Sequence, residues 1–408
     1  INLRVLLILF FSGFSITTIA QNISNEGMEF WTVFPTHVPF QDDLATMNVN
    51  VTSRFDTEVT VSCGNTSATK AVPANTVVTF LVDRAASYIS TADGNQNLSN
   101  RGIHIVVTPG KPKIVAYSHV FASARSAATL ILPVEALGQQ YFSMNYNQDN
   151  NGQNFLAVVA AEDDTDLILH KKDGTTLAIN GLKKGDVYQY ILPSVDLTGT
   201  YVETAANSSC KKFAAFSGSS AMRIGGNLGG IDPLLQQLYA VDSWGKTYGV
   251  VPFVNRRFII RALAQQDNTA IYLNGTLQAT INKGGFFEQE LTEPTIVSSD
   301  KLISVAQYSF TQEYSSVWGG ALNSGDPEMV LLNPIEFNIK NITLFSSDER
   351  RIFEKYINVF MKTSQTASFK INGLAPESGN WTPMPSDPSY SYLQTEVFDQ
   401  SLTLTAND

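Results

Sequence analysis

The stretch VDSWGKTYG, from Val241 to Gly249, repeats a pattern that the chain has already used at VEALGQQYF, from Val134 to Phe142. Both carry an apolar residue, an acid, two further residues and then Gly-x-x-Tyr. A Gly-x-x-aromatic element also begins at Gly27, so the three occurrences are 111 and 107 residues apart. A degenerate fourth copy, PIEFNIKNI from Pro334, keeps the apolar–acid pair but has isoleucines in place of the Gly and the Tyr. Self-similarity at a fixed period indicates tandem structural units.

Two further landmarks recur in the same order after each motif. The first is a threonine ahead of an alternating apolar segment, and the second is an apolar segment that ends in an aromatic residue and a serine. The threonines are Thr57, Thr165, Thr269 and Thr366, and the serines are Ser118, Ser217 and Ser309. The fourth copy reaches Asp408 before its aromatic-Ser segment, so we expect the natural protein to continue into downstream domains.

The residue pattern inside each copy is typical of β-strands. In the second copy, six short segments, several of them alternating apolar and polar residues, are separated by Gly, Asp or Asn. KKDGTT at Lys171–Thr176 and LNGT at Leu273–Thr276 carry Asp-Gly and Asn-Gly at matching places, which predicts tight hairpins. About seven strands in roughly 100 residues is the size of an immunoglobulin-like sandwich. We therefore predict an all-β tandem array of immunoglobulin-like β-sandwich modules; one propeller-like closed β array is the alternative.

The landmarks also predict module boundaries. The modules are expected at residues 21–133, 134–237, 238–331 and, truncated, 332–408. We expect the motif glycine to take a positive φ, which glycine adopts at low cost, and the aromatic residue after it to point into the module core. DPLLQQLY from Asp232 predicts a short helix, because Asp is a favoured N-cap and Pro a favoured first helical residue. Irregular connections are expected after each aromatic-Ser strand.

The first twenty residues have the character of an export signal. Arg4 is followed by an apolar run, Val5–Phe14, and by the small residues of TIA, which ends at Ala20. This run is shorter than the about 20 residues that a membrane span needs, so we predict a signal peptide that is cleaved near Ala20. The mature segment is then predicted to be secreted or at the cell surface, without membrane insertion. Two cysteines, Cys63 and Cys210, are too few for a disulfide framework.

Charge and motif content disfavour several function classes. The net charge of −10 and the lack of a basic run argue against nucleic acid as a partner. The acidic run at 162–166 could supply Ca²⁺ ligands, but the matching positions of the other copies mostly lack the charge, which favours a solvated turn. GGNLGG at 225–230 lacks the Lys-Ser/Thr of a phosphate-binding loop. We predict no catalytic residues, no cofactor and no metal.

DPLLQQLYAVDSWGKTYGVVPF, from Asp232 to Phe253, resembles the N-terminal domain of the IgG Fc-binding protein family. GMEFWTVFP from Gly27 is similar to the start of that domain, so the resemblance covers roughly residues 25–408. It implies a secreted binding domain; the animal member is mucin-associated and binds the Fc part of IgG. Similar domains open surface proteins of Bacteroidetes that end in type IX secretion sorting or gliding-motility-associated domains. IgG binding itself is not carried over to this chain.

These observations lead to three functional hypotheses. The first is a non-enzymatic binding or adhesion region that recognises a glycoprotein, a polysaccharide or another surface protein. Its expected contacts are Arg223, Tyr314 and Trp318, because these residue types are enriched at interface hot spots and lie in long connections. The second hypothesis is a structural spacer or assembly element of a secreted surface protein. The third and weakest is an accessory module of a carbohydrate-active enzyme.

Overall fold

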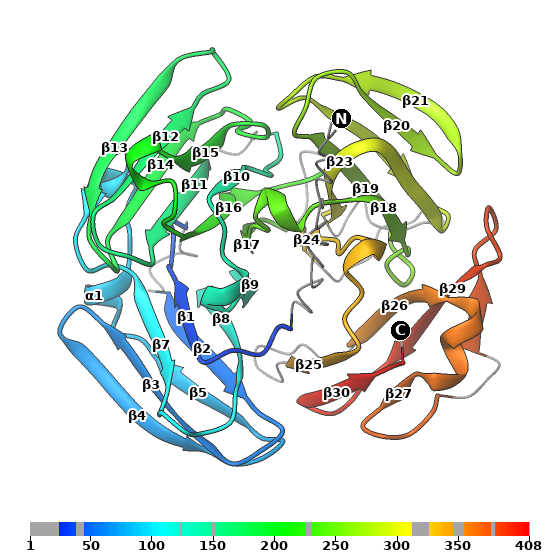
Figure 1. Ribbon diagram of the computed structural model, residues 1–408, viewed down its shortest axis with the longest axis horizontal. Helices are drawn as coiled ribbons and strands as arrows, with labels where there is room; N and C mark the ends of the chain where they lie inside the picture. Colours follow the sequence, from blue (N-terminus) through cyan, green and yellow to red (C-terminus); the bar gives the residue numbers. More distant parts are fainter. Residues whose placement is uncertain are drawn as a thin grey trace, which may run out of the picture.

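The computed structural model describes residues 24–37, 45–122, 125–147, 152–225, 230–311, 326–345, 355–376 and 380–407. They form an all-β fold, and four sets of strands follow one another in chain order around the view of Figure 1, from blue at the lower left to red at the lower right. The predicted β-sandwich class is confirmed. The alternative of one propeller-like closed array is wrong, because the strands build facing sheets rather than single blades.

The first set consists of two four-stranded sheets, in the orders β1-β7-β3-β4 and β5-β2-β8-β9. Both sheets contribute to one hydrophobic core, for example through Val49 of β2 and Val59 of β3. The elements are β1 (Glu29–Thr32), β2 (Thr46–Thr52), β3 (Thr57–Cys63), β4 (Thr66–Val72), β5 (Val77–Leu81), α1 (Arg84–Ser87), the 3₁₀ helix η1 (Thr91–Asp93), β7 (Ile103–Val107), β8 (Val115–Ala122) and β9 (Arg125–Ile131).

The second set repeats this plan with sheets β10-β15-β12-β13 and β17-β16-β11-β14-β6. Strand β6 precedes β7 in the chain but pairs with β14, so it joins the first set to the second. The elements are β6 (Asn97–Leu98), η2 (Val134–Ala136), β10 (Gln140–Phe142), β11 (Gln153–Ala160), β12 (Thr165–His170), β13 (Thr176–Leu182), β14 (Val187–Pro193), β15 (Tyr201–Thr204), η3 (Ala206–Ser208), β16 (Phe213–Met222) and β17 (Asp232–Gln237).

The third set is one sheet that folds over itself through the long strand β23, which pairs with β18, β19, β20 and β24. Its elements are η4 (Val241–Ser243), β18 (Gly245–Val250), β19 (Phe258–Ala264), β20 (Thr269–Leu273), β21 (Thr276–Ile281), β22 (Phe286–Leu291), β23 (Thr295–Ser309) and β24 (Met329–Leu331). Two three-stranded sheets, β25-β30-β27 and β26-β29-β28, form the fourth set. Its elements are η6 (Ile335–Phe337), β25 (Asn341–Phe345), β26 (Tyr356–Lys362), η8 (Thr363–Ser368), β27 (Lys370–Ile371), β28 (Trp381–Pro383), β29 (Tyr390–Glu396) and β30 (Ser401–Thr405).

Neighbouring sets pack through strands that are buried on both faces. In β11, Phe155 and Val159 join the core of the first set, whereas Leu156 and Val158 join that of the second. β19 behaves in the same way between the second and third sets. Burial on both faces explains why these strands read as continuous apolar runs. β26 differs, because its residues alternate between exposed and partly buried over most of its length.

The Gly-x-x-Tyr motif is a contact between successive sets. The tyrosines point into the core as predicted: Tyr141 and Tyr248 are each 1% exposed. The Tyr141 hydroxyl accepts the N–H of Gly138 (2.7 Å) and donates to Phe213 O (2.8 Å), and Tyr248 makes the matching pair of bonds. In the first copy, where the aromatic residue is a phenylalanine, the Gly27 N–H donates directly to Ile114 O.

The motif glycines do not take a positive φ, so that prediction is wrong. Each is required instead because a side chain would collide with the residue that precedes the next 3₁₀ helix. A Cβ on Gly27 would lie 2.3 Å from Pro133 Cβ, one on Gly138 2.4 Å from Ala240 Cβ, and one on Gly245 2.2 Å from Pro334 Cβ. The Gly-x-x-aromatic motif therefore marks the same close contact with the next 3₁₀ helix at three places in the chain.

Two other local predictions are wrong. DPLLQQLY is not a helix, since Asp232–Gln237 is strand β17, antiparallel to β16. Its surroundings override the local preference, because the Asp232 carboxylate accepts the N–H of Ser126 and Gln237 bonds the backbone of Leu132. The connection after β8 is not irregular either, because β9 forms a hairpin with β8.

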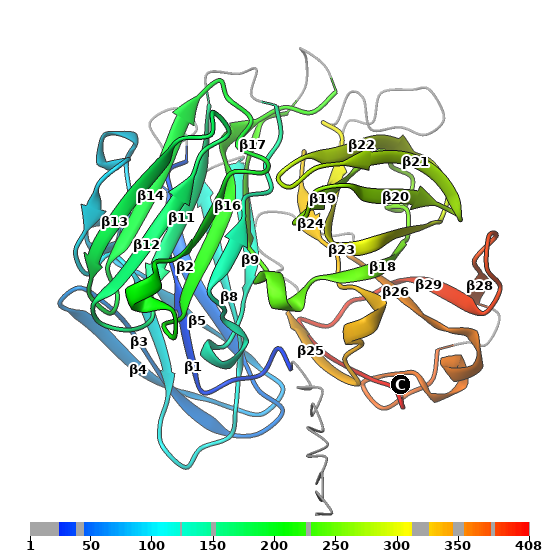
Figure 2. The ribbon, with the colours of Figure 1, turned by 45° about the horizontal axis from the view of Figure 1, so that its top comes forward.

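The fourth set also contacts the first, which closes the ring seen in Figure 1. Asn25 Nδ2 donates to Thr343 O (2.8 Å), and the hydroxyls of Thr52 and Ser401 lie 3.0 Å apart. Figure 2 shows β25 beside the first set. The residue boundaries predicted for the modules stay a prediction. Strand β6 lies before the first of these boundaries in the chain but pairs with β14 of the second set.

Candidate binding site

The third and fourth sets do not share a hydrophobic core. Among the described residues, one continuous core joins the first and second sets and another joins the second and third. The cores of the third and fourth sets are separate. A cleft of about 1080 Å³ lies between them.

The cleft has mostly apolar walls. The third set contributes Val251 and Phe253, the segment after β24 contributes Leu332, and the fourth set contributes Val359 and Met361. A few hydrogen bonds span the boundary: the side chains of Asn358 and Gln394 both donate to Pro252 O, at 3.1 and 2.6 Å. A concave apolar surface with a few convergent polar groups is the usual form of a ligand site.

Two acids line one side of this cleft. Asp326 and Glu328 flank the end of β23, where Ser309 Oγ donates to Asp326 O and accepts the N–H of Glu328. Burial raises the pKa of Glu328 to about 7 and also raises the pKa of Asp326. Asp232 lies close behind them, and burial together with the charge of Asp326 raises its pKa to about 9. Perturbed carboxyl groups beside a cleft are candidates for a functional role.

These raised pKa values predict a loss of stability with rising pH. Carboxyl groups titrate near pH 4 in the unfolded chain. Above that pH the folded state keeps a proton that the unfolded state has lost, so the contribution of these groups to the unfolding free energy is fully present only at low pH. It is lost as the pH rises through about 7 for Glu328 and about 9 for Asp232. Asp232→Asn should therefore flatten the fall in unfolding free energy between pH 5 and 9, by at most about 1.4 kcal/mol per pH unit.

The measurement is urea unfolding at a series of pH values. Asp387→Asn is the matched control, because this exposed carboxylate has a lowered pKa through its bonds to Ser389 and so titrates below the tested range. Parallel pH profiles for Asp232→Asn and the unchanged chain would contradict the assignment.

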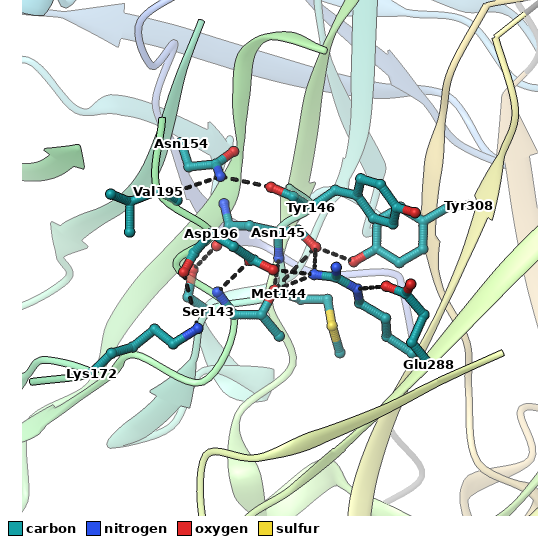
Figure 3. Close-up of polar contacts among 12 residues, drawn as sticks. Ser143, Met144, Asn145, Tyr146, Asn154, Lys172, Val195, Asp196, Glu288 and Tyr308 are labelled. Carbon is teal, nitrogen blue, oxygen red and sulfur yellow. Dashed lines mark hydrogen bonds and ion pairs between the residues drawn. The ribbon is translucent and has the colours of Figure 1, made fainter. Parts of the chain in front are cut away.

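The boundary between the second and third sets is held by a buried arginine, Arg261 of β19, which is 1% exposed. Figure 3 labels Asn145, Asp196 and Glu288, which accept its hydrogen bonds. Its Nη1 bonds Asn145 O (2.8 Å), Asp196 Oδ2 (2.8 Å) and Thr198 Oγ1 (2.9 Å), all from the second set. Its Nε donates to Glu288 Oε2 at 2.7 Å. The rings of Tyr146 and Phe286 lie 4.4 and 4.3 Å from the guanidinium. These acceptors come from both the second and the third sets, which is the pattern of a structural joint.

Of the three predicted contact residues, the structure describes Arg223 alone. Arg223 follows β16 and is partly buried, and it is absent from the described lining of the cleft. Tyr314 and Trp318 lie outside the described residues, as does the predicted signal segment at 1–20. Sequence reasoning missed the cleft residues; the one available signal was the weaker apolar content of YINVFMK relative to its counterparts FLAVVAA and FIIRALA.

The acidic run at 162–166 is a turn whose carboxylates form ion pairs and hydrogen bonds within the protein. Asp164 pairs with Lys183, and Asp166 accepts the N–H of Gly181 and the side chain of Asn207. Within the described ranges no group of His, Cys, Asp and Glu has the arrangement of a metal site. The two cysteines are not bonded to each other: Cys63 is buried and Cys210 exposed. No described helix has the length and apolar character needed to cross a membrane.

The chain is thus an array of β-sandwich units with a cleft between two of them. The chain belongs to the IgGFc binding protein family, whose sequence model matches residues 127–407. This is a family of binding domains, as the resemblance predicted. No curated protein matches the sequence. One solved structure with 11% identity, over 90% of each chain, is described as "Ca2+-stabilized adhesin helps an Antarctic bacterium reach out and bind ice". Its TM-score of 0.13 supports no structural conclusion.

Proposed function

We propose that this chain is a non-enzymatic, exported binding or adhesion region of a larger secreted or cell-surface protein. Membership of a family of binding domains carries the proposal. The proposed partner is a protein or glycoprotein, and we place the main contact in the cleft between the third and fourth sets. Its apolar walls suit inserted side chains of a protein better than they suit a polysaccharide.

The proposed ligand site has a second part. Arg223, Tyr314 and Trp318 stay as proposed contacts in the connections that follow β16 and β23, because aromatic residues and arginine often dominate interface energetics. The alternative of a structural spacer is favoured by the two continuous cores, which hold the first three sets rigidly together.

The test is a binding screen with the immobilised chain against glycoproteins, including mucins and IgG Fc, and against polysaccharides. Asn333→Trp should weaken retention of a protein ligand at least tenfold, because this exposed side chain lines the cleft and the indole would fill it. Thr69→Trp on the exposed strand β4 is the control and should bind as the unchanged chain does. If no glycoprotein or polysaccharide is retained, the structural-spacer hypothesis is favoured. Turnover of a polysaccharide would instead support the accessory-module hypothesis.

A further inference from the structure

A buried polar cluster lies where the segment after β1 meets strand β14, at the boundary between the first and second sets. Thr36, His37 and Gln189 are all buried, and Gln189 is 0% exposed. The main-chain N–H of Thr36 donates to Gln189 Oε1 at 2.9 Å. This hydrogen bond brings together two residues that are 153 positions apart in the chain.

One polar atom of each of these side chains has no hydrogen bond. Among the described residues, the Thr36 hydroxyl, the amide nitrogen of Gln189 and His37 Nε2 are buried without a partner. Buried polar groups are normally hydrogen-bonded, so exceptions of this kind call for an explanation. A hydroxyl, a carboxamide and an imidazole are the nucleophile, the acyl group and the base of an acyl-transfer site.

The contact between Thr36 and Gln189 favours attack of the hydroxyl on the carboxamide. The N–H of Thr36 polarises the side-chain carbonyl of Gln189 and would stabilise negative charge on Oε1, as an oxyanion-hole donor does. The hydroxyl belongs to the same residue as this donor, so rotation about χ1 is the movement that turns it toward Cδ of Gln189. A buried site that holds both groups replaces the entropy cost of their encounter.

His37 supplies a base beside this pair. Its Nδ1 lies 3.2 Å from Pro35 O, and because a carbonyl oxygen only accepts hydrogen bonds, Nδ1 carries the proton and Nε2 the lone pair. Burial lowers the pKa of His37 to about 4, so the ring is neutral at neutral pH. A neutral imidazole is able to accept the hydroxyl proton and to pass it to a departing nitrogen.

We propose that Thr36 and Gln189 form an intramolecular ester cross-link. The bond between Thr36 Oγ1 and Gln189 Cδ forms, the bond between Cδ and Nε2 breaks, and the hydroxyl proton leaves with the nitrogen as ammonia. The reaction is balanced without an oxidant or a reductant. The ester would hold the first set covalently to the second, as the bonds of Arg261 hold the second set to the third. It does not depend on the ligand proposed for the cleft.

The first measurement is the intact mass of the chain and of Thr36→Val, which keeps the shape of threonine without its hydroxyl. Relative to the mass calculated from its sequence, the unchanged chain should be lighter than the variant by one ammonia. Removal of a leader changes both proteins equally. Thr36→Ser keeps a hydroxyl and should also lose ammonia. If the unchanged chain and Thr36→Val differ from their calculated masses by the same amount, the proposal is overturned.

Digestion with trypsin locates the bond. Cleavage after Arg54, Lys184 and Lys211 places Thr36 and Gln189 in separate peptides, which we expect to find joined. Hydroxylamine cleaves esters but leaves amides intact, so it should separate the joined peptides. A joined species that resists hydroxylamine, or one that contains other peptides, would contradict the assignment.

His37→Phe tests the base, because it keeps a flat buried ring without a proton acceptor. The rate at which ammonia is lost after cell-free synthesis should fall at least about tenfold, the usual range for removal of a general base. Urea unfolding checks that this variant folds. An unchanged rate would overturn the role of His37 and leave the ester itself to be judged by the mass of Thr36→Val.

Discussion

Arg261→Met should lower the unfolding free energy by about 3–5 kcal/mol, the loss measured when one partner of a buried ion pair is removed. Methionine fills much of the space of the arginine stem but supplies no donor. Asp196, which is 10% exposed in this pair, would keep its charge without the guanidinium. The carbonyl of Asn145 would lose one of its three donors and keep the hydroxyls of Tyr308 and Thr198. We expect a lower urea midpoint in a fluorescence-monitored unfolding curve.

The size of this effect follows from where the arginine lies. β19 is buried on both faces, and Arg261 is on the face turned toward the second set. Its bonds therefore span two sets, so their loss weakens the boundary rather than one loop. Hydrogen exchange should accordingly increase in β19 and in the segment after β10, which carries Asn145.

Two controls make the result specific. Arg257→Met breaks a bidentate pair between the residue just before β19 and Glu290 of β22, but that pair is about one-third exposed and should be worth less than about 1 kcal/mol. Arg261→Lys keeps the charge but lacks the planar fork, so it should fall between the unchanged chain and the methionine variant. If Arg261→Met is as stable as Arg257→Met, or more stable, the role of Arg261 in holding the second and third sets together is contradicted.

The repeat made the fold class predictable because its landmarks coincide with strand positions. The predicted Thr57, Thr165 and Thr269 begin β3, β12 and β20, and the aromatic-Ser pairs fall in β8, β16 and β23. Thr366 differs, because it lies in the 3₁₀ helix η8. Alternation and hairpin signals are local, so a single sequence can reveal them. The helix expected at Asp232 failed because its capping signals were local, whereas β16 and β9 decide the conformation of that segment.

The sites were less predictable because they depend on contacts between distant residues. Arg261 is one charge within the apolar run FIIRALA, and its partners lie 65 and 116 residues earlier, at Asp196 and Asn145. The cleft is lined by residues that are far apart in the chain, from Gly249 in the third set to Ala406 in the fourth. No local pattern in the sequence shows that they meet.

Gly138→Ala should destabilise the chain by about 1–3 kcal/mol, the usual cost of forcing an extra carbon into a packed core. The glycine has ordinary backbone angles, so strain at a positive φ is not involved. The new Cβ would lie 2.4 Å from Ala240 Cβ, and the next nearest atom, Ala240 Cα, is 3.8 Å away. The expected loss therefore comes from a single contact between the second set and the start of the third.

A double-mutant cycle tests this directly. Ala240→Gly removes the carbon that the new Cβ would meet, and on its own should cost about 0.5–1 kcal/mol, as glycine does in a restricted position. Combined with Gly138→Ala, it moves one methyl group across the interface. The double variant should be more stable than the sum of the two losses predicts, with a coupling of at least about 1 kcal/mol. Additive losses would show that the motif glycine is needed for some reason other than the approach of the next set.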